Sequence, residues 1–111
     1  MPDERAARVA HNEARFREIN ERVERDLMEM VQAPDETLPF VCECGRRDCG
    51  ATIEVTLGDY ERVRSDSTCF MLQPGHEMPD LETVVDRGAG FAVVRKHPET
   101  QDISRDTDPR R

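Results

Sequence analysis

The sequence predicts an α+β protein, with a long N-terminal helix followed by a small domain of about four strands and two short helices. Two observations predict this fold. Residues 3–32 contain no Gly or Pro and are rich in Ala, Arg and Glu, as helices are. Beyond residue 39 the apolar residues alternate with polar ones, as in strands. The chain has 111 residues, of which 36% are hydrophobic and 36% charged, so we expect one domain with a small core.

Residues 1–33 are predicted to form the helix. Most of its apolar residues recur every seven positions, and the others fall on the same side of the helix. Together they form a narrow coiled-coil-like seam: Val9, Phe16, Ile19, Val23, Leu27 and Met30. Asn12 and Asp26 fall on the weaker line of the heptad, so the pattern does not require a long two-stranded coiled coil. The seam fits a helix that packs along its own domain, and it also fits a dimerising or partner-binding helix.

Residues 34–39 are predicted to be a linker, because Pro34 and Pro39 prevent continuation of the helix. The compact domain then spans residues 40–98. Its first part, residues 40–57, is predicted to be a β-hairpin with residues 45–50 at the tip.

The rest of the domain is predicted from shorter signals. A helix begins near Asp59, a strand covers residues 69–73, and residues 74–79 form a rigid loop. Leu81, Val84 and Val85 have helical spacing and predict a short helix that ends at Gly88. A last strand covers residues 91–96, and residues 99–111 are polar enough to predict a disordered tail.

The most informative motif is the group Cys42, Cys44 and Cys49, in the pattern C-x-C-x4-C. Three thiolates this close together are suited to a soft metal ion, and Zn²⁺ in a structural site takes four Cys or His ligands. No apolar run resembles a signal peptide, so we expect a cytoplasmic protein with reduced thiols, and a metal site in preference to disulfides. The domain is thus predicted to be held together by a zinc ion, with the β-hairpin of residues 40–57 forming a zinc knuckle.

The fourth ligand is left open between His76 and Cys69. His76 is preferred, because it lies between Pro74-Gly75 and Pro79 in a loop that can fold back over the hairpin tip. Cys69 begins an apolar strand, where a cysteine is more often a small buried side chain. Water or another residue is the remaining alternative.

Catalysis is not expected. Glu77 beside His76 would suit a metal-dependent hydrolase, but three thiolates reduce the acidity of a zinc-bound water. No deaminase motif, nucleophile-base pair or phosphate loop is found. His11 and His97 are expected to be solvated.

The net charge of −8 is spread along the chain, which disfavours nucleic acid as the main partner. Arg46 and Arg47 at the hairpin tip could still contact a phosphate or an acidic protein surface. No apolar run approaches the length of a membrane helix.

Five segments together resemble an uncharacterised family of short bacterial proteins: residues 12–22, 40–45, Cys49, residues 60–64 and the Pro-Gly-His-Glu of residues 74–77. The resemblance spans about residues 12–97. It implies a small metal-binding fold whose ligands are Cys42, Cys44, Cys49 and His76, and it implies no activity.

These observations predict a small cytoplasmic zinc-binding protein that acts as a non-enzymatic protein-interaction or regulatory module. Its partner would be a protein that contacts the N-terminal helix or the zinc hairpin, or a second copy in a homodimer. A thiol/zinc redox sensor is the alternative, in which oxidation of the cysteines releases zinc. A nucleic-acid-associated factor and a metal-dependent hydrolase are less favoured.

Overall fold

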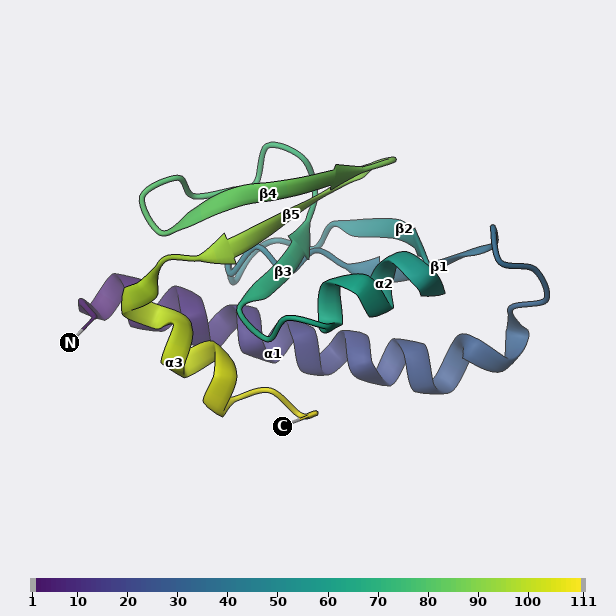
Figure 1. Ribbon diagram of the computed structural model, residues 1–111, viewed down its shortest axis with the longest axis horizontal. Helices are drawn as coiled ribbons and strands as arrows, with labels where there is room; N and C mark the ends of the chain where they lie inside the picture. Colours follow the sequence, from purple (N-terminus) through teal and green to yellow (C-terminus); the bar gives the residue numbers. More distant parts are fainter. Residues whose placement is uncertain (1, 111) are drawn as a thin grey trace.

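The computed structural model describes residues 2–110 and confirms the α+β fold with its long N-terminal helix. Figure 1 shows that helix running the length of the molecule, with the strands gathered to one side of it. The elements in chain order are α1 (Glu4–Leu27), the 3₁₀ turn η1 (Met28–Met30), β1 (Thr37–Val41), β2 (Thr52–Thr56), α2 (Leu57–Arg64), β3 (Cys69–Leu72), β4 (Glu82–Gly88), β5 (Phe91–Lys96) and α3 (Pro98–Asp106).

Helix α1 begins at a capping residue, Asp3, whose Oδ1 accepts a hydrogen bond of 2.7 Å from the backbone N–H of Ala6. It ends at Leu27, earlier than predicted. Its buried residues are mostly small or polar: Ala6, Val9, Ala10, Glu13, Ala14, Arg17 and Asn20. Helix α1 therefore packs along its own domain through a face beside the predicted seam, of which Ile19 and Met30 remain 38% and 69% exposed.

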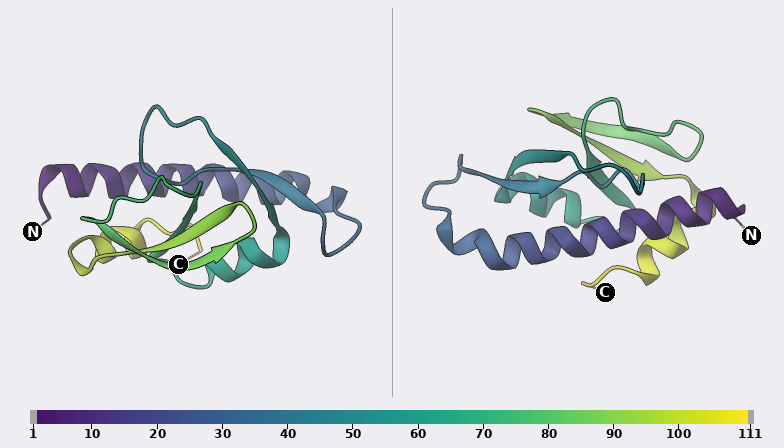
Figure 2. Two further views of the ribbon diagram at one scale, coloured as in Figure 1. Left: turned by 90° about the horizontal axis from the view of Figure 1, so that it is seen from above. Right: turned by 180° about the vertical axis from the view of Figure 1, so that it is seen from behind.

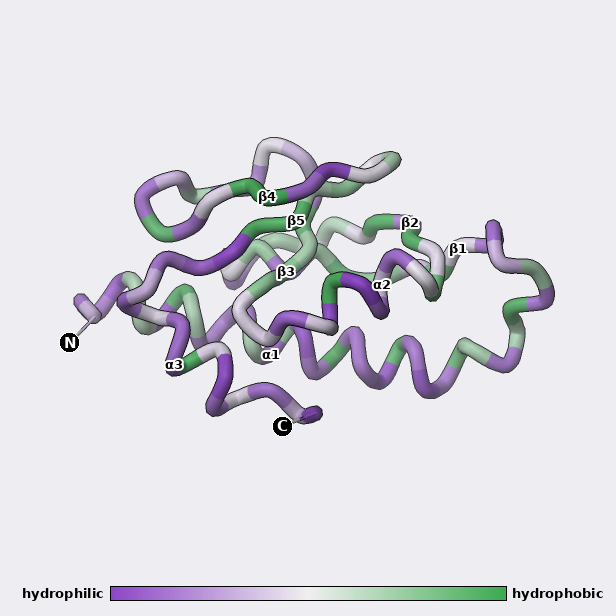
Figure 3. The backbone as a smooth tube through the Cα atoms, in the orientation of Figure 1, coloured by the Kyte–Doolittle hydropathy of each residue, from purple (hydrophilic) through white to green (hydrophobic). Residues whose placement is uncertain are grey.

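The strands form two antiparallel sheets. In the first, β1 pairs with β2, so that Phe40 lies opposite Ile53. Because β1 begins at Thr37, the predicted linker of residues 34–39 is partly strand. The second sheet has the order β3-β5-β4. Figure 3 shows the hydrophobic residues concentrated in the strands, while hydrophilic ones dominate α1.

Strand β4 corrects the prediction of a helix at Leu81, Val84 and Val85. Two adjacent β-branched valines favour an extended chain, and the apolar strand β5 needs a partner along its second edge. The turn to β5 closes at Gly90, whose φ of +80° suits glycine. The helical spacing in this segment was therefore misleading.

Within residues 2–110 the core has three clusters, and the two larger ones lie on opposite faces of β3 and β5. The first contains Phe40 stacked on Tyr60, with ring centroids 4.3 Å apart. The second contains Cys42 and Cys44 together with Phe70, Leu72, Ala92 and Val94. Two of the predicted metal ligands thus belong to the buried interior.

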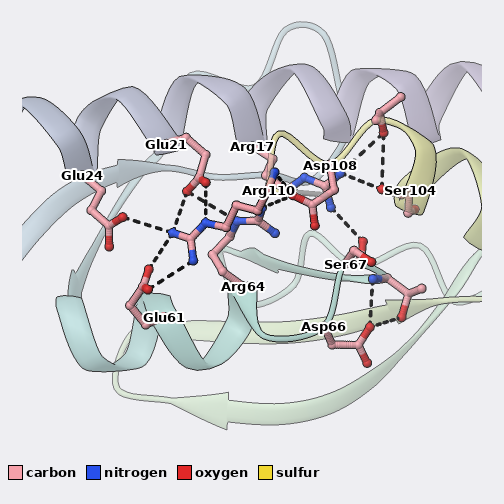
Figure 4. A network of polar contacts seen from close by, with 12 residues as sticks. Arg17, Glu21, Glu24, Glu61, Arg64, Asp66, Ser67, Ser104, Asp108 and Arg110 are labelled. Carbon is pink, nitrogen blue, oxygen red and sulfur yellow. Dashed lines mark hydrogen bonds and ion pairs between the residues drawn. The ribbon is translucent and has the colours of Figure 1, made fainter.

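The predicted disordered tail, residues 99–111, is wrong over most of its length, because Pro98–Asp106 forms α3. Figure 4 shows what holds it in place. Arg17 donates a hydrogen bond of 2.8 Å to the carbonyl oxygen of Ser104, and Arg64 forms a buried ion pair with Asp108. These partners are far apart in sequence, so local polarity gave no sign of them.

No helix within residues 2–110 is long and apolar enough to cross a membrane.

Candidate metal centre

The segment that follows β1 changes its pairing partner between two consecutive residues. The backbone N–H of Cys42 donates to the carbonyl of Ala51 at 3.0 Å, and that of Glu43 donates to Met71 at 2.9 Å. The C-x-C motif is therefore held between the β1-β2 hairpin and β3. In this extended segment, Cys42 and Cys44 lie on one side and Glu43 on the other.

A tight turn then returns the chain to Cys49. The backbone N–H of Cys49 donates to the carbonyl of Arg46 at 3.1 Å, and Gly45 has a φ of +80°. Figure 2 shows this loop lying beside α1. The contact is close, because a Cβ at Gly45 would lie 2.8 Å from Cγ1 of Val9. Asn12 Nδ2 donates a hydrogen bond of 3.0 Å to the Gly45 carbonyl, which fixes the loop on the helix.

His76 comes from the loop between β3 and β4. Pro74 and Gly75 occupy the central positions of a turn in which Gly75 has a φ of +92° and the His76 N–H donates to Gln73 at 3.0 Å. Proline followed by a glycine of positive φ is typical of a type II turn. The turn directs His76 toward the cysteines.

The structure brings together the four predicted residues Cys42, Cys44, Cys49 and His76, whose ligand atoms all lie within 4.8 Å of one another. Nδ1 of His76 lies 3.7 Å from Sγ of Cys42 and 3.6 Å from Sγ of Cys49. Zn–S and Zn–N bonds of usual length at tetrahedral angles would put these atoms about 3.6 Å apart. The donor set and its spacing can hold a metal ion.

Hydrogen bonds around the thiols favour the thiolate that a metal requires. Sγ of Cys42 accepts a hydrogen bond of 3.1 Å from the backbone N–H of Gln73. A hydrogen bond between the Cys42 and Cys44 thiols lowers the pKa of Cys44 to about 5, and together with burial raises the pKa of Cys42. These contacts therefore favour the thiolate form of Cys44.

Cys69, the alternative fourth ligand, is not part of this group. It lies in the other core cluster with Met71 and Phe91, and burial raises the pKa of its thiol. His97 precedes α3, with Nε2 3.1 Å from Oγ1 of Thr83, and His11 is exposed. Cys69 therefore acts as a small buried side chain, as its sequence context suggested.

Glu77, the residue that would suit a hydrolase, is engaged within its own loop. Its Oε1 accepts a hydrogen bond of 3.0 Å from the backbone N–H of Gly75. Its Oε2 is buried and has no hydrogen-bond partner within residues 2–110. The carboxylate thus helps to order the turn that carries His76.

Sequence reasoning missed two residues that support the site, Asn20 and Glu43, both completely buried. Oε1 of Glu43 accepts a hydrogen bond of 3.1 Å from the backbone N–H of Met71. Burial raises the pKa of Glu43 to about 7, against the opposing effect of its hydrogen bonds. Strand alternation could have revealed it, because a residue between two same-facing cysteines must point the other way.

A second buried polar group joins α1 to the second sheet. Nζ of Lys96 lies 2.9 Å from a carboxylate oxygen of Glu13 and 2.9 Å from one of Glu82, and all three side chains are fully buried. Burial raises the pKa of Glu13. Burial would lower the pKa of Lys96, but the two carboxylates outweigh it and raise that pKa. Glu13 also lies next to Gly45, so this group supports the helix face on which the metal loop rests.

No family model matches this chain, and no curated protein or solved structure is detectably similar to it. The resemblance to the short bacterial proteins therefore stays a prediction.

Proposed function

We propose that this is a small zinc-binding protein in which Cys42, Cys44, Cys49 and His76 coordinate one Zn²⁺. The spacing of the His76 Nδ1 atom, 3.7 Å and 3.6 Å from two cysteine sulfurs, carries the proposal, because it matches an edge of a tetrahedral zinc site. Three thiolates and one imidazole are also a ligand set that zinc takes in structural sites.

The proposed ion has a structural role. The ligands come from the segment after β1, from the turn at Cys49 and from the loop before β4, so one ion would join three otherwise separate stretches of backbone. Four protein ligands complete a tetrahedral shell and leave no position for a reactive water. We therefore propose a non-enzymatic interaction or regulatory module that works with reduced thiols in the cytoplasm.

Metal content and stability test the proposal. The purified protein should contain about one zinc ion per chain. Removal of the ion by a chelator should lower the thermal midpoint by roughly 10 °C or more, because much of the binding free energy of a structural ion is folding free energy. A metal-free protein that kept its full thermal stability would contradict the structural role.

Two matched variants test the ligand assignment. His76→Ala removes a proposed ligand, so zinc affinity should fall by a factor of about a hundred or more. Cys69→Ala shortens a buried side chain in the other core cluster, so it should lower stability slightly and leave zinc affinity unchanged. The opposite ranking would move the fourth ligand to Cys69.

One observation favours the redox sensor as a second candidate. Cys49 and His76 are half-buried, whereas Cys42 and Cys44 are buried, so an oxidant in solution reaches Cys49 first. Two thiolates, one of them Cys49, would give two electrons to hydrogen peroxide. A disulfide would form, and the peroxide with two protons would leave as two water molecules.

Peroxide should then release zinc, as followed by a chromogenic chelator, and a thiol reductant should restore zinc binding. Zinc that stays bound while a free thiol in the same solution is oxidised would exclude the sensor and leave the structural role intact.

A further inference from the structure

A cavity with a volume of about 490 Å³ lies between α2 and the second sheet, and none of the proposed zinc ligands lines it. Clefts of this size are typical of small-molecule sites, which combine apolar walls with a few polar groups. Helix α2 and the turn after it form one wall of the cavity, and β4 forms the other. The cavity is therefore a candidate binding site that is separate from the metal centre.

The floor of the cavity is apolar. Phe91 and Val93 of β5, Val63 of α2 and Cys69 of β3 contribute to it, and all four belong to the first core cluster. A helix about 10 Å wide covers only about two strands spaced about 4.8 Å apart. Because α2 packs against β2 and β3, this part of the core stays open on the side of β4.

The wall formed by β4 contains a β-bulge. The pairing of β4 with β5 shifts its register between Val84 and Asp86, so Val85 is the extra residue. Neighbouring residues of a regular strand point to opposite faces, but Val85 and Asp86 both line the cavity. The bulge thus places an apolar side chain, 41% exposed, and a carboxylate side by side at the same cavity. Bulges often turn side chains toward binding sites in this way.

The charges around the cavity leave Asp86 without a partner of opposite charge. Arg62 forms an ion pair with Asp59, and Arg95 forms one with Asp66. Within residues 2–110, Asp86 forms no ion pair. Its Oδ1 accepts a hydrogen bond of 2.8 Å from the backbone N–H of the next residue, which carries no charge. A cation is therefore the group that complements this lining.

We propose that the cavity binds a small organic amine with an apolar body. Its ammonium group pairs with Asp86, and its hydrocarbon part lies against Val85 and Phe91. A carboxylate or phosphate ligand would have to displace the aspartates that already pair with both guanidinium groups of the lining. The net charge of −8 also favours a cation over an anion. The proposal does not depend on the proposed zinc coordination.

NMR titration of the zinc-loaded full chain with 3-phenylpropylamine tests this proposal. The backbone amide signals of Val85, Asp86 and Phe91 should shift and saturate, with a dissociation constant of about 1 mM for a ligand this small. Two related probes separate the contributions of charge and apolar area. 3-Phenylpropionate has the opposite charge and should bind about tenfold more weakly. Propylamine lacks the ring and should also bind about tenfold more weakly.

Two matched variants test the role of the carboxylate. Asp86→Asn should weaken binding of 3-phenylpropylamine by about fivefold, which is near the upper limit for an ion pair at an exposed site. Asp106→Asn should leave it unchanged, because Asp106 is an exposed residue of α3 that lies outside the cavity and forms no ion pair within residues 2–110.

Three results would overturn the proposal. The first is the absence of saturable shifts at the three residues up to about 20 mM amine. The second is binding of 3-phenylpropionate as tight as that of the amine, since the cavity would then select for apolar area alone. The third is an equal effect of Asp86→Asn and Asp106→Asn.

Discussion

Nδ2 of Asn20 donates a hydrogen bond of 2.8 Å to Oε2 of Glu43, and both side chains are completely buried. Asn20 also brackets the backbone of Val41, because its Oδ1 accepts from the Val41 N–H at 2.8 Å and its Nδ2 donates to the Val41 carbonyl at 2.9 Å. One side chain of α1 thus binds the two residues on either side of Cys42, Val41 and Glu43. The metal centre is positioned by this buried polar contact as well as by its ligands.

Asn20→Ala should lower the free energy of unfolding by about 2–3 kcal/mol, because it leaves Oε2 of Glu43 and the N–H and carbonyl of Val41 without their Asn20 partner. Zinc affinity should fall as well. Asn12→Ala is the control, since it removes a single, partly buried hydrogen bond to Gly45 and should cost about 1 kcal/mol. Urea denaturation measures both. Equal losses of unfolding free energy in the two variants would show that the Asn20 hydrogen bonds stabilise the protein no more than the single Asn12 hydrogen bond does.

Gly45 and Gly50 lie on either side of the turn from Arg46 to Cys49 and should respond very differently to substitution by alanine. A Cβ at Gly45 would lie 2.8 Å from Val9, and the alanine would have to adopt a φ of +80°. Gly45→Ala should therefore lower the free energy of unfolding by about 2 kcal/mol or more and weaken zinc binding. A Cβ at Gly50 meets nothing within 4 Å, so Gly50→Ala should be nearly neutral. Zinc titration and thermal unfolding check the pair. Similar stability in the two variants would argue against a metal loop seated on α1.

Lys96→Met should be among the most destabilising substitutions. It leaves Glu13 and Glu82 together in the interior without a counter-charge, which typically costs about 3–5 kcal/mol. The neighbouring Arg95→Met breaks only a surface ion pair with Asp66 and should cost less than about 1 kcal/mol. Chemical denaturation compares the two. A Lys96→Met protein as stable as Arg95→Met would mean that the buried group does not hold α1 to the second sheet.

The pH dependence of stability should include a contribution from Glu24, which lies near Glu61 and Arg110 (Figure 4). Burial, and then the neighbouring Glu61, raise the pKa of Glu24 from 4.5 to about 7. The folded protein therefore keeps a proton that the unfolded chain releases above pH 4.5, so this contribution to stability falls as the pH rises from 4.5 to about 7.

Glu24→Gln mimics the protonated side chain, which donates a hydrogen bond to Glu61. The variant should match the wild-type protein near about pH 4.5 and exceed its stability by about 1 kcal/mol near about pH 8. Urea denaturation at both pH values measures the difference. A variant that loses stability relative to the wild-type protein as the pH rises would contradict the raised pKa.

Local patterns in the sequence were enough for part of the fold. The hairpin and the grouping of Cys42, Cys44 and Cys49 follow from alternation and from glycines close in sequence, and His76 from the Pro-Gly turn before it. Strand β4 was missed because its valines also fit a helix. The segment forms a strand and not a helix because it pairs with the edge of β5, a partner that is not visible in the local pattern.

Helix α3 and the Asn20–Glu43 contact were missed for a related reason. Arg17 is 87 residues away from the carbonyl of Ser104 that it binds, and Asn20 is 23 residues from Glu43. Residues this polar usually indicate a solvated surface, so burial becomes visible only once the chain has folded. The buried polar residues of α1 are therefore the part of the protein that local sequence patterns do not predict.

X-ray absorption at the zinc edge of the purified protein tests the central claim most directly. Four ligands from Cys42, Cys44, Cys49 and His76 predict three sulfur neighbours at about 2.3 Å and one nitrogen neighbour at about 2.0 Å. A shell of four sulfurs would place Cys69 at the metal in place of His76. A shell dominated by oxygen, or a protein without bound zinc, would contradict the metal centre itself.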